Sequence, residues 1–99
     1  KSAGNRISPQ EIEEAALATG LVAEAVALGL ADERLGQAVH LVVRGDEGSA
    51  EPLARQLQRD LPNFMQPRSI HWRSAMPLNP NGKIDRVALQ HQLEAELGA

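Results

Sequence analysis

The stretch PLNPNGKIDR, residues 77–86, contains the side chain whose type and setting most clearly suggest chemistry. Its two prolines restrict the backbone, and its Asn-Gly pair turns readily because glycine adopts positive φ. Lys83 follows this pair, so we expect its ammonium group to project from an ordered loop. A fixed cation can stabilise negative charge in a transition state. Most surface lysines are only solvated charges, however, and the loop by itself leaves both interpretations open.

Lys83 does not belong to a P-loop, the glycine-rich motif that binds nucleotide phosphates. That motif needs a glycine five residues before its second glycine, and Pro77 occupies this position. It also needs a serine or threonine directly after the lysine, where this sequence has Ile84. If Lys83 meets a phosphate, it must do so in a different structural context.

Other ionisable side chains have simpler interpretations. Three histidines lack the spacing of metal ligands: His40, His71 and His91. Two of them fall on predicted strands, where surface or edge positions are expected, so no metal site is predicted. Three glutamates fall in the first turns of a predicted helix, where they favour the positive end of the helix dipole: Glu11, Glu13 and Glu14.

The composition restricts the class of protein. The chain has 99 residues, enough for one domain with a modest core, and its net charge of −3 gives no electrostatic support for a nucleic-acid partner. It contains no cysteine, which excludes disulfides and thiol chemistry and fits a cytoplasmic location. No apolar run approaches the roughly 20 residues that span a membrane. Because the sequence begins KSAGNRIS, we expect a domain of a longer protein, although a processed free-standing protein remains an alternative.

The elements that must position Lys83 follow from hydrophobic periodicity. A short extended piece at residues 4–8 leads to a helix with Ser8 as its cap and Gly20 at its end. Strands are predicted over 22–32 and 36–45, antiparallel through a short polar turn, and over 68–74. Further helices are predicted over 51–61 and over 85–97, the latter capped by Asp85. This order predicts an α+β, two-layer domain with a small, mostly antiparallel sheet of about three strands covered by helices.

Four segments taken together resemble a known family. The two ends carry KSAGNRISPQEIE, residues 1–13, and MPLNPNGKIDR, residues 76–86. Between them, VAEAVALGLADERLGQAVHLVV resembles the family's strand pair with its D-E-x-x-G connection, and LQRDLPNFMQP resembles its L-P-x-x-M-x-P segment. The whole chain, residues 1–99, thus resembles the mobile C-terminal subdomain of the adenylate-forming enzymes. These include acyl-CoA synthetases, fatty acyl-AMP ligases, nonribosomal-peptide adenylation domains and luciferases.

The resemblance implies an ATP-dependent, AMP-forming ligase that activates a carboxylic acid. The acid and ATP, with Mg²⁺, would first give acyl-AMP at a site formed chiefly by a large N-terminal domain. The small domain would then rotate, and a thiol of CoA or of carrier-protein phosphopantetheine would take the acyl group. Lys83 matches the family's adenylation lysine, and Arg6 matches an arginine that faces the ATP phosphates. Gly4 matches a glycine beside the pantetheine tunnel, and Lys1 matches a lysine that some members use in the second step.

Some residues depart from the family pattern. Asn5 stands where many members have an aromatic residue. The segment PNGKIDR resembles the corresponding segment of peptide synthetases and acyl-AMP ligases. The segment KSAGNRISPQEIE resembles that of CoA ligases, a class that includes enzymes of fatty acid metabolism. The acid and the thiol acceptor are therefore left open. Alone, the domain is expected to be inactive. The alternative is an interaction module that retains the fold without the chemistry.

Overall fold

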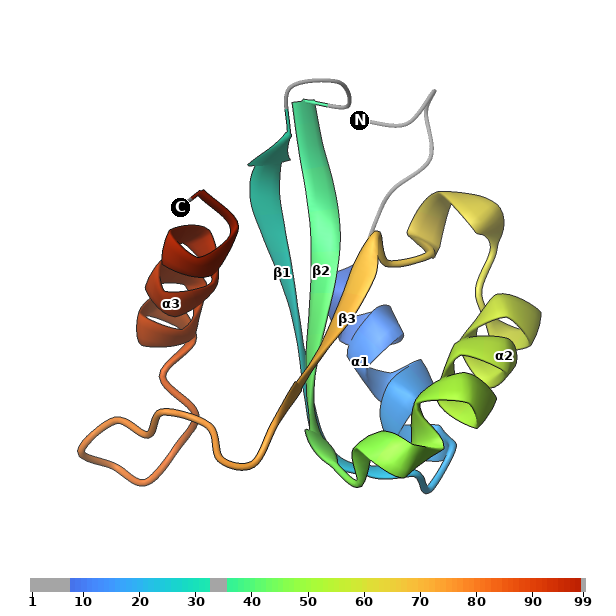
Figure 1. The fold of residues 1–99 in the computed structure, drawn as a ribbon, viewed down its shortest axis with the longest axis horizontal. Helices are drawn as coiled ribbons and strands as arrows, with labels where there is room; N and C mark the ends of the chain where they lie inside the picture. The colour runs from blue at the N-terminus through green and yellow to red at the C-terminus, as the bar shows by residue number, and fades with distance from the viewer. Residues whose placement is uncertain (1–7, 33–35, 99) are drawn as a thin grey trace.

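The computed structural model of the protein describes residues 8–32 and 36–98. Its helices and strands follow the predicted order (Figure 1). The elements are α1 (Pro9–Ala18), β1 (Val22–Asp32), β2 (Gly36–Gly45), the 3₁₀ helix η1 (Glu47–Ser49), α2 (Ala50–Asp60), the 3₁₀ helix η2 (Asn63–Met65), β3 (Ser69–Arg73) and α3 (Arg86–Gly98). The bounds of β1 and β2 agree with the predicted strands, and the other elements differ from prediction by one or two residues.

The three strands form one mixed sheet in the order β1-β2-β3. β1 and β2 are antiparallel, with a register that runs from Val22 opposite Gly45 to Asp32 opposite Gly36. β3 is parallel to β2, because the chain crosses over through α2 before it enters the sheet again. The long β1–β2 ladder keeps the sheet mostly antiparallel, as predicted.

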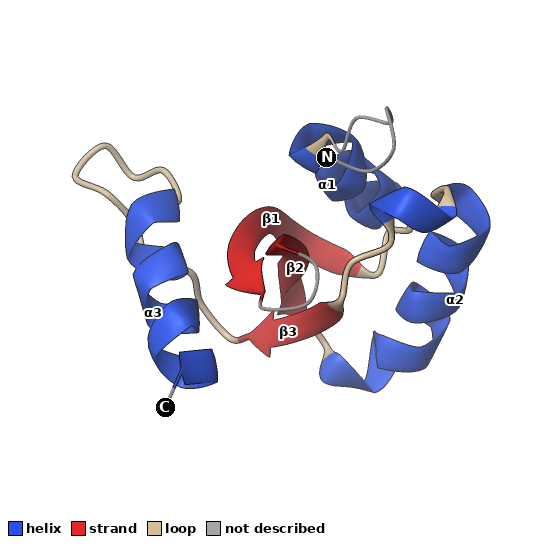
Figure 2. Ribbon diagram, turned by 90° about the horizontal axis from the view of Figure 1, so that it is seen from above, coloured by secondary structure: helices blue, strands red, loops and turns tan. Residues whose placement is uncertain are grey.

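Helices cover both faces of the sheet (Figures 1 and 2). Leu41 and Val43 of β2 are fully buried in a cluster with residues of α1 and α2. Val26 and Leu28 of β1 are buried in a second cluster with residues of α3. The predicted α+β class and three-stranded sheet are confirmed. The fold has one helical layer more than predicted. The buried apolar residues Val26 and Leu28 of β1 face one side of the sheet, and Leu41 and Val43 of β2 face the other, so helices cover both sides.

Each helix contributes a short apolar stripe to one of these clusters. Ile12 and Ala16 of α1, and Leu53 and Leu57 of α2, are almost completely buried on one face of the sheet. On the other face α3 buries Leu89 and Leu93, while Leu97 at its end is about half exposed at 51%. The sheet thus lies between two apolar layers. The layer that contains α3 also contains Met76 and Ile84, which flank the Lys83 loop in sequence.

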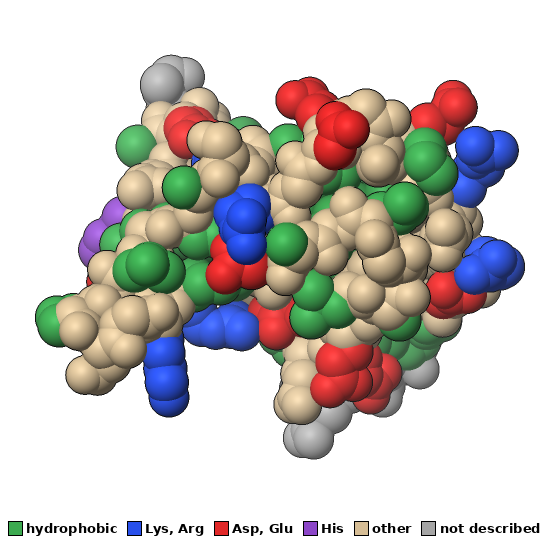
Figure 3. All heavy atoms as spheres, turned by 90° about the horizontal axis from the view of Figure 1, so that it is seen from below, with side chains coloured by type: hydrophobic (Ala, Val, Ile, Leu, Met, Phe, Trp, Pro, Cys, Tyr) green, Lys and Arg blue, Asp and Glu red, His purple; other side chains and the backbone are tan. Residues whose placement is uncertain are grey.

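Charged side chains are distributed over the surface. In the face seen in Figure 3, basic and acidic side chains alternate and do not gather into one basic patch. Among the described residues, no helix is both long enough and apolar enough to cross a bilayer.

Candidate functional site: the Lys83 loop

The loop that carries Lys83 is a small hairpin closed by backbone hydrogen bonds. The Asp85 N–H donates to the Pro77 carbonyl oxygen over 2.8 Å, and Leu78 forms an antiparallel bridge with Ile84. Further up the loop, the Asn79 N–H donates to the Lys83 carbonyl oxygen over 2.7 Å. Lys83 therefore sits on an ordered backbone, as its sequence context predicts.

Asn79 organises this hairpin through both its side chain and its backbone. Its Oδ1 accepts hydrogen bonds from the N–H groups of Asn81 (2.9 Å) and Lys83 (3.1 Å). Its carbonyl oxygen accepts from the Gly82 N–H over 2.9 Å, which closes a four-residue turn. Both backbone groups of Lys83 are thus bonded to Asn79. The two prolines and the Asn-Gly pair predicted the turn, but the part played by Asn79 was not predicted, although an Asn-Pro dipeptide is a known signal for turn initiation.

Gly82 supplies the backbone conformation that the turn needs. Its φ of +81° lies in the left-handed region, which disfavours side chains with a Cβ atom. Open space surrounds the position where a Cβ would lie, so the requirement for glycine is conformational and not steric. Lys83 directly follows Gly82, at the end of the turn.

The ammonium group of Lys83 is exposed and has no ion-pair partner among the described residues. It is also the single lysine in the described part of the chain, since the only other lysine is Lys1. Arginines of the domain behave differently: Arg44, Arg59 and Arg73 each lie within 2.8 Å of a carboxylate oxygen. The loop therefore combines a fixed backbone with a cation that no other described residue neutralises.

The base of the loop is anchored in the apolar layer beneath α3. Met76 is buried and Ile84 is partly buried against the same cluster, which contains Leu89 and Leu93. Asp85 then starts α3: its Oδ1 accepts from the Ala88 N–H over 3.0 Å, as predicted for a helix cap. Apolar contacts and a helix start thus hold both strands of the hairpin.

Glu13 differs from its sequence-based interpretation as a helix-start charge. Its side chain is only 12% exposed, and its Oε2 accepts from the Ala27 N–H of β1 over 2.8 Å. Arg86, the first residue of α3, places Nη2 3.0 Å from each Glu13 carboxylate oxygen. Sequence spacing within α1 could not reveal partners that lie 14 and 73 residues away.

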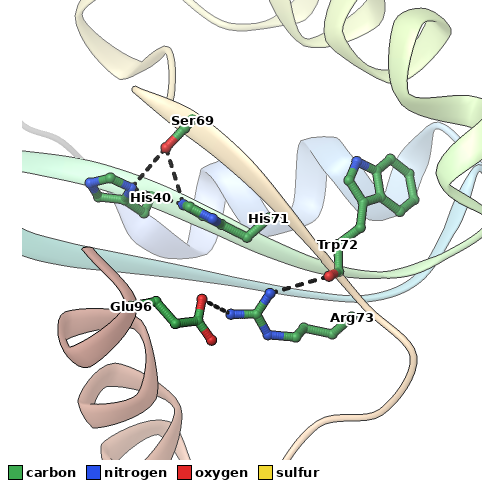
Figure 4. A network of polar contacts seen from close by, with 6 residues as sticks. All are labelled: His40, Ser69, His71, Trp72, Arg73 and Glu96. Carbon is green, nitrogen blue, oxygen red and sulfur yellow. Dashed lines mark hydrogen bonds and ion pairs between the residues drawn. The ribbon is translucent and has the colours of Figure 1, made fainter. Parts of the chain in front are cut away.

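A second polar group, the histidine cluster, consists of His40, Ser69 and His71 (Figure 4). Ser69 Oγ lies 2.9 Å from His40 Nδ1 and 3.1 Å from His71 Nε2, and the two ring nitrogens lie 3.1 Å apart. The predicted surface position is wrong for His40, which is buried at 7% exposure between β1 and β3. The parallel β2–β3 register places His40 opposite Ser69 and creates this cluster.

Burial and neighbouring charge make His71 a weak base. Its pKa is lowered, first by desolvation and then by the positive charges of His40 and Arg73. Glu96 of α3 opposes this shift, but its carboxylate is already paired with Arg73 at 2.6 Å. His91 is exposed on α3, apart from the cluster. No group of three metal-binding side chains is present in residues 8–32 and 36–98.

Three of the predicted site residues, Lys1, Gly4 and Arg6, lie outside the described residues. Among the described residues, Lys83 is bonded to Asn79 within the hairpin, Asp85 closes the hairpin on Pro77, and the next residue, Arg86, pairs with Glu13. The predicted roles of Lys1, Gly4 and Arg6 stay predictions.

Comparison with known proteins identifies the family to which this chain belongs. The family described as "AMP-binding enzyme C-terminal domain" matches residues 11–83, about three quarters of the chain. The chain belongs to this family. The matched segment of this AMP-binding enzyme C-terminal domain extends from α1 through Glu13 to Lys83 itself.

Individual relatives agree with this identification. The chain is 37% identical over 98 residues to an acetyl-coenzyme A synthetase of Penicillium chrysogenum, covering 94% of this chain and 15% of the relative. It is 40% identical over 91 residues to tyrocidine synthase 2 of Brevibacillus parabrevis, covering 90% of this chain and 2% of the relative. The fold matches the Mycobacterium tuberculosis fatty acyl CoA synthetase with a TM-score of 0.85 and 29% identity, covering 96% of this chain and 19% of that one. This domain thus spans less than a fifth of each of these relatives.

Proposed function

We propose that this domain is the C-terminal part of an ATP-dependent, AMP-forming ligase that activates a carboxylic acid, with Lys83 as its adenylation residue. Family membership and similarity to acyl-CoA and peptide synthetases support the class of enzyme. The observation that carries the role of Lys83 is its setting. Its backbone is bonded on both sides to Asn79, while its ammonium group is exposed without an ion-pair partner among the described residues.

In the proposed first step, a carboxylate oxygen of the acid attacks the α-phosphorus of ATP. A new O–P bond forms as the bond to pyrophosphate breaks, and the products are acyl-AMP and pyrophosphate. Both reactants are anionic, so a cation between them reduces their repulsion and stabilises charge on the α-phosphate oxygens. Because its backbone is already fixed, Lys83 can act there with little reorganisation.

In the proposed second step, the domain rotates and withdraws Lys83 from the reaction centre. The sulfur of a CoA or carrier-protein pantetheine thiol attacks the acyl carbonyl carbon and loses its proton, and AMP leaves. Gly4 and Lys1 are assigned to this second state, and Arg6 to the ATP phosphates in the first. One small domain would then serve two half-reactions by presenting two faces in turn.

The proposed partner of the Lys83 loop is the large N-terminal domain of the same polypeptide, which would also hold most of the ATP, its Mg²⁺ and the acid. Two apolar side chains flank the loop on the surface: Leu78 is 60% exposed and Val87 is 65% exposed. Apolar side chains beside a lysine suit a surface that is covered when the lysine enters a neighbouring cavity. We expect the isolated domain to be inactive and the complete ligase to work in the cytoplasm.

Replacing the lysine tests this proposal. In the complete ligase, Lys83→Ala is expected to lower acyl-AMP formation by about 10²–10³-fold, because one charge-stabilising group is lost from the transition state. ATP–pyrophosphate exchange measures this step. Thioester formation from supplied acyl-AMP should continue, because Lys83 acts only in the first half-reaction.

Arg55→Ala provides the matched control, because Arg55 is an exposed cation on α2 with a side chain that is 72% accessible. This variant removes one positive charge from the domain and should retain ATP–pyrophosphate exchange. Unchanged exchange in Lys83→Ala would refute the assigned role of the lysine. It would instead favour the alternative of a domain that keeps the fold without the chemistry.

A further inference from the structure

Glu13 occupies a position where three elements of the domain meet. It belongs to α1, accepts a hydrogen bond from the backbone of β1 at Ala27, and forms an ion pair with Arg86 at the start of α3. Its side chain is 12% exposed, whereas that of Arg86 is 54% exposed. A largely buried carboxylate needs such partners, because burial without hydrogen bonds or a counter-charge is costly. The contacts thus explain why a charge is tolerated at this point.

The two helices joined by this contact pack on opposite faces of the sheet. α1 belongs to the apolar layer with α2, and α3 belongs to the layer on the other side. β1 is an edge strand of the described sheet, so the Ala27 N–H can point outward to Glu13. The Glu13 side chain therefore reaches around the sheet edge and connects the two helical layers.

The contact also fixes the base of the Lys83 loop. Arg86 directly follows Asp85, whose N–H closes the hairpin on the Pro77 carbonyl oxygen. On one side the hairpin rests on the apolar cluster through Met76 and Ile84. The ion pair of Arg86 adds a polar attachment to α1 and β1. Two attachments of different kinds restrict rotation of the hairpin about its base more than one does.

We propose that Glu13 is a positioning residue for Lys83: through Arg86 it holds the direction in which the loop presents the ammonium group. This inference rests on the proposed adenylation role of Lys83. Glu13 itself need not touch the substrate. Because misplacement of a catalytic group reduces the fraction of productive geometries, a weakened attachment lowers the rate of the step that uses the group.

The test uses Glu13→Gln and Arg86→Gln, separately and together, in the complete ligase. Gln retains an oxygen that can accept from the Ala27 N–H, so Glu13→Gln removes the charge while keeping the bond to β1. Each single variant is expected to lower kcat for acyl-AMP formation by roughly two- to fivefold, as for the loss of one partly exposed ion pair. KM for the acid should stay unchanged, because the loop acts on the transition state.

The double variant should lose no more than the more affected single variant, because both changes remove the same contact. Arg86→Lys should restore part of the loss, since it returns a cation near Glu13. Thioester formation from supplied acyl-AMP should stay within about twofold of the unmodified enzyme in all of these variants, because the second step does not use Lys83.

Glu24→Gln is the matched control. It removes a carboxylate from β1 that is paired with Arg44 of β2 at 2.6 Å, a contact in which Glu13, Arg86 and the Lys83 hairpin take no part. If Glu13→Gln acted by general destabilisation, Glu24→Gln would lower adenylation to the same extent, and both half-reactions would fall together. That result would overturn the positioning role, as would additive losses in the double variant.

The outcomes separate the two proposals. Loss of adenylation in Lys83→Ala with full kcat in Glu13→Gln would overturn the inference about Glu13 and leave the proposed function intact. Full adenylation in Lys83→Ala would remove the proposed function itself.

Discussion

The Lys83 loop and the histidine cluster are both ordered by hydrogen bonds, but they leave different groups available. In the loop the bonds run between backbone groups and Asn79, and the ammonium group projects beyond them. In the histidine cluster the side chains bond to one another, between the sheet and the end of α3. A group that must neutralise a substrate cannot already be neutralised by its own protein. A fixed backbone that presents a lysine with no ion-pair partner among the described residues suits the proposed role of Lys83, whereas the side chains of the histidine cluster satisfy one another.

Among changes that leave Lys83 itself in place, removal of the Asn79 side-chain amide is expected to have the largest effect on the loop. Asn79→Ala deletes two hydrogen bonds, those from Asn81 and Lys83, each worth about 1 kcal/mol. We expect adenylation to fall by about tenfold, because Lys83 loses its fixed direction. ATP–pyrophosphate exchange in the complete ligase measures the effect.

Asn81→Ala is the control for this change, since it alters the same residue type in the same turn while its backbone N–H remains. Its rate should stay within about twofold of the unmodified enzyme. Equal losses in the two variants would mean that the Asn79 side chain has no special part in orienting the lysine.

A smaller effect is expected at Gly82. Gly82→Ala forces a residue with a Cβ atom into a φ of +81° and should cost about 1 kcal/mol of unfolding free energy. Gly98→Ala is its control, because open space also surrounds Gly98, at the end of α3, and its φ is not positive. Urea unfolding of the two variants compares them directly. An equal change in both would contradict the conformational role of Gly82.

The smallest effect concerns the histidine cluster, where we expect a change in pH dependence without a change in adenylation. The pKa of His71 is lowered in the folded chain from its ordinary value of 6.5. At pH values between the lowered pKa of the folded chain and the ordinary value of 6.5, the unfolded chain binds more protons than the folded chain. The free energy of unfolding should therefore decrease as the pH falls below about 6.5. His40, Arg73 and Glu96 are the charged or titratable groups that act on this histidine.

His71→Gln should flatten this dependence while leaving ATP–pyrophosphate exchange at neutral pH unchanged. Urea unfolding of the unmodified and variant chains at about pH 7.5 and pH 5.5 gives the comparison. Adenylation that fell as much in His71→Gln as in Asn79→Ala would remove the distinction between the two regions.

Local sequence signals were sufficient for the elements and for the loop. Apolar alternation placed β1 and β2, and Ser8 and Asp85 marked helix starts that the structure confirms through their side-chain hydrogen bonds. The two prolines and the glycine of PLNPNGK indicated a stiff turn. All of these signals depend on residues within one turn or one strand, where spacing alone determines geometry.

Contacts between distant segments could not be predicted in the same way. The sequence of β3 does not indicate that this strand runs parallel to β2. The parallel register places Ser69 opposite His40 and so creates the histidine cluster. Likewise Glu13 has the appearance of an ordinary helix-start glutamate until the fold places Arg86 beside it. Side chains that connect layers are defined by packing, and so only the three-dimensional structure reveals them.

The most direct test of the central claim is a crystal structure of the complete ligase with a non-hydrolysable mimic of the acyl-adenylate. We expect Lys83 Nζ to lie about 2.7–3.1 Å from an oxygen of the acyl carboxyl group or of the α-phosphate. A structure in the same adenylation state with the Lys83 loop turned toward bulk solvent, and those oxygens held by other groups, would contradict it.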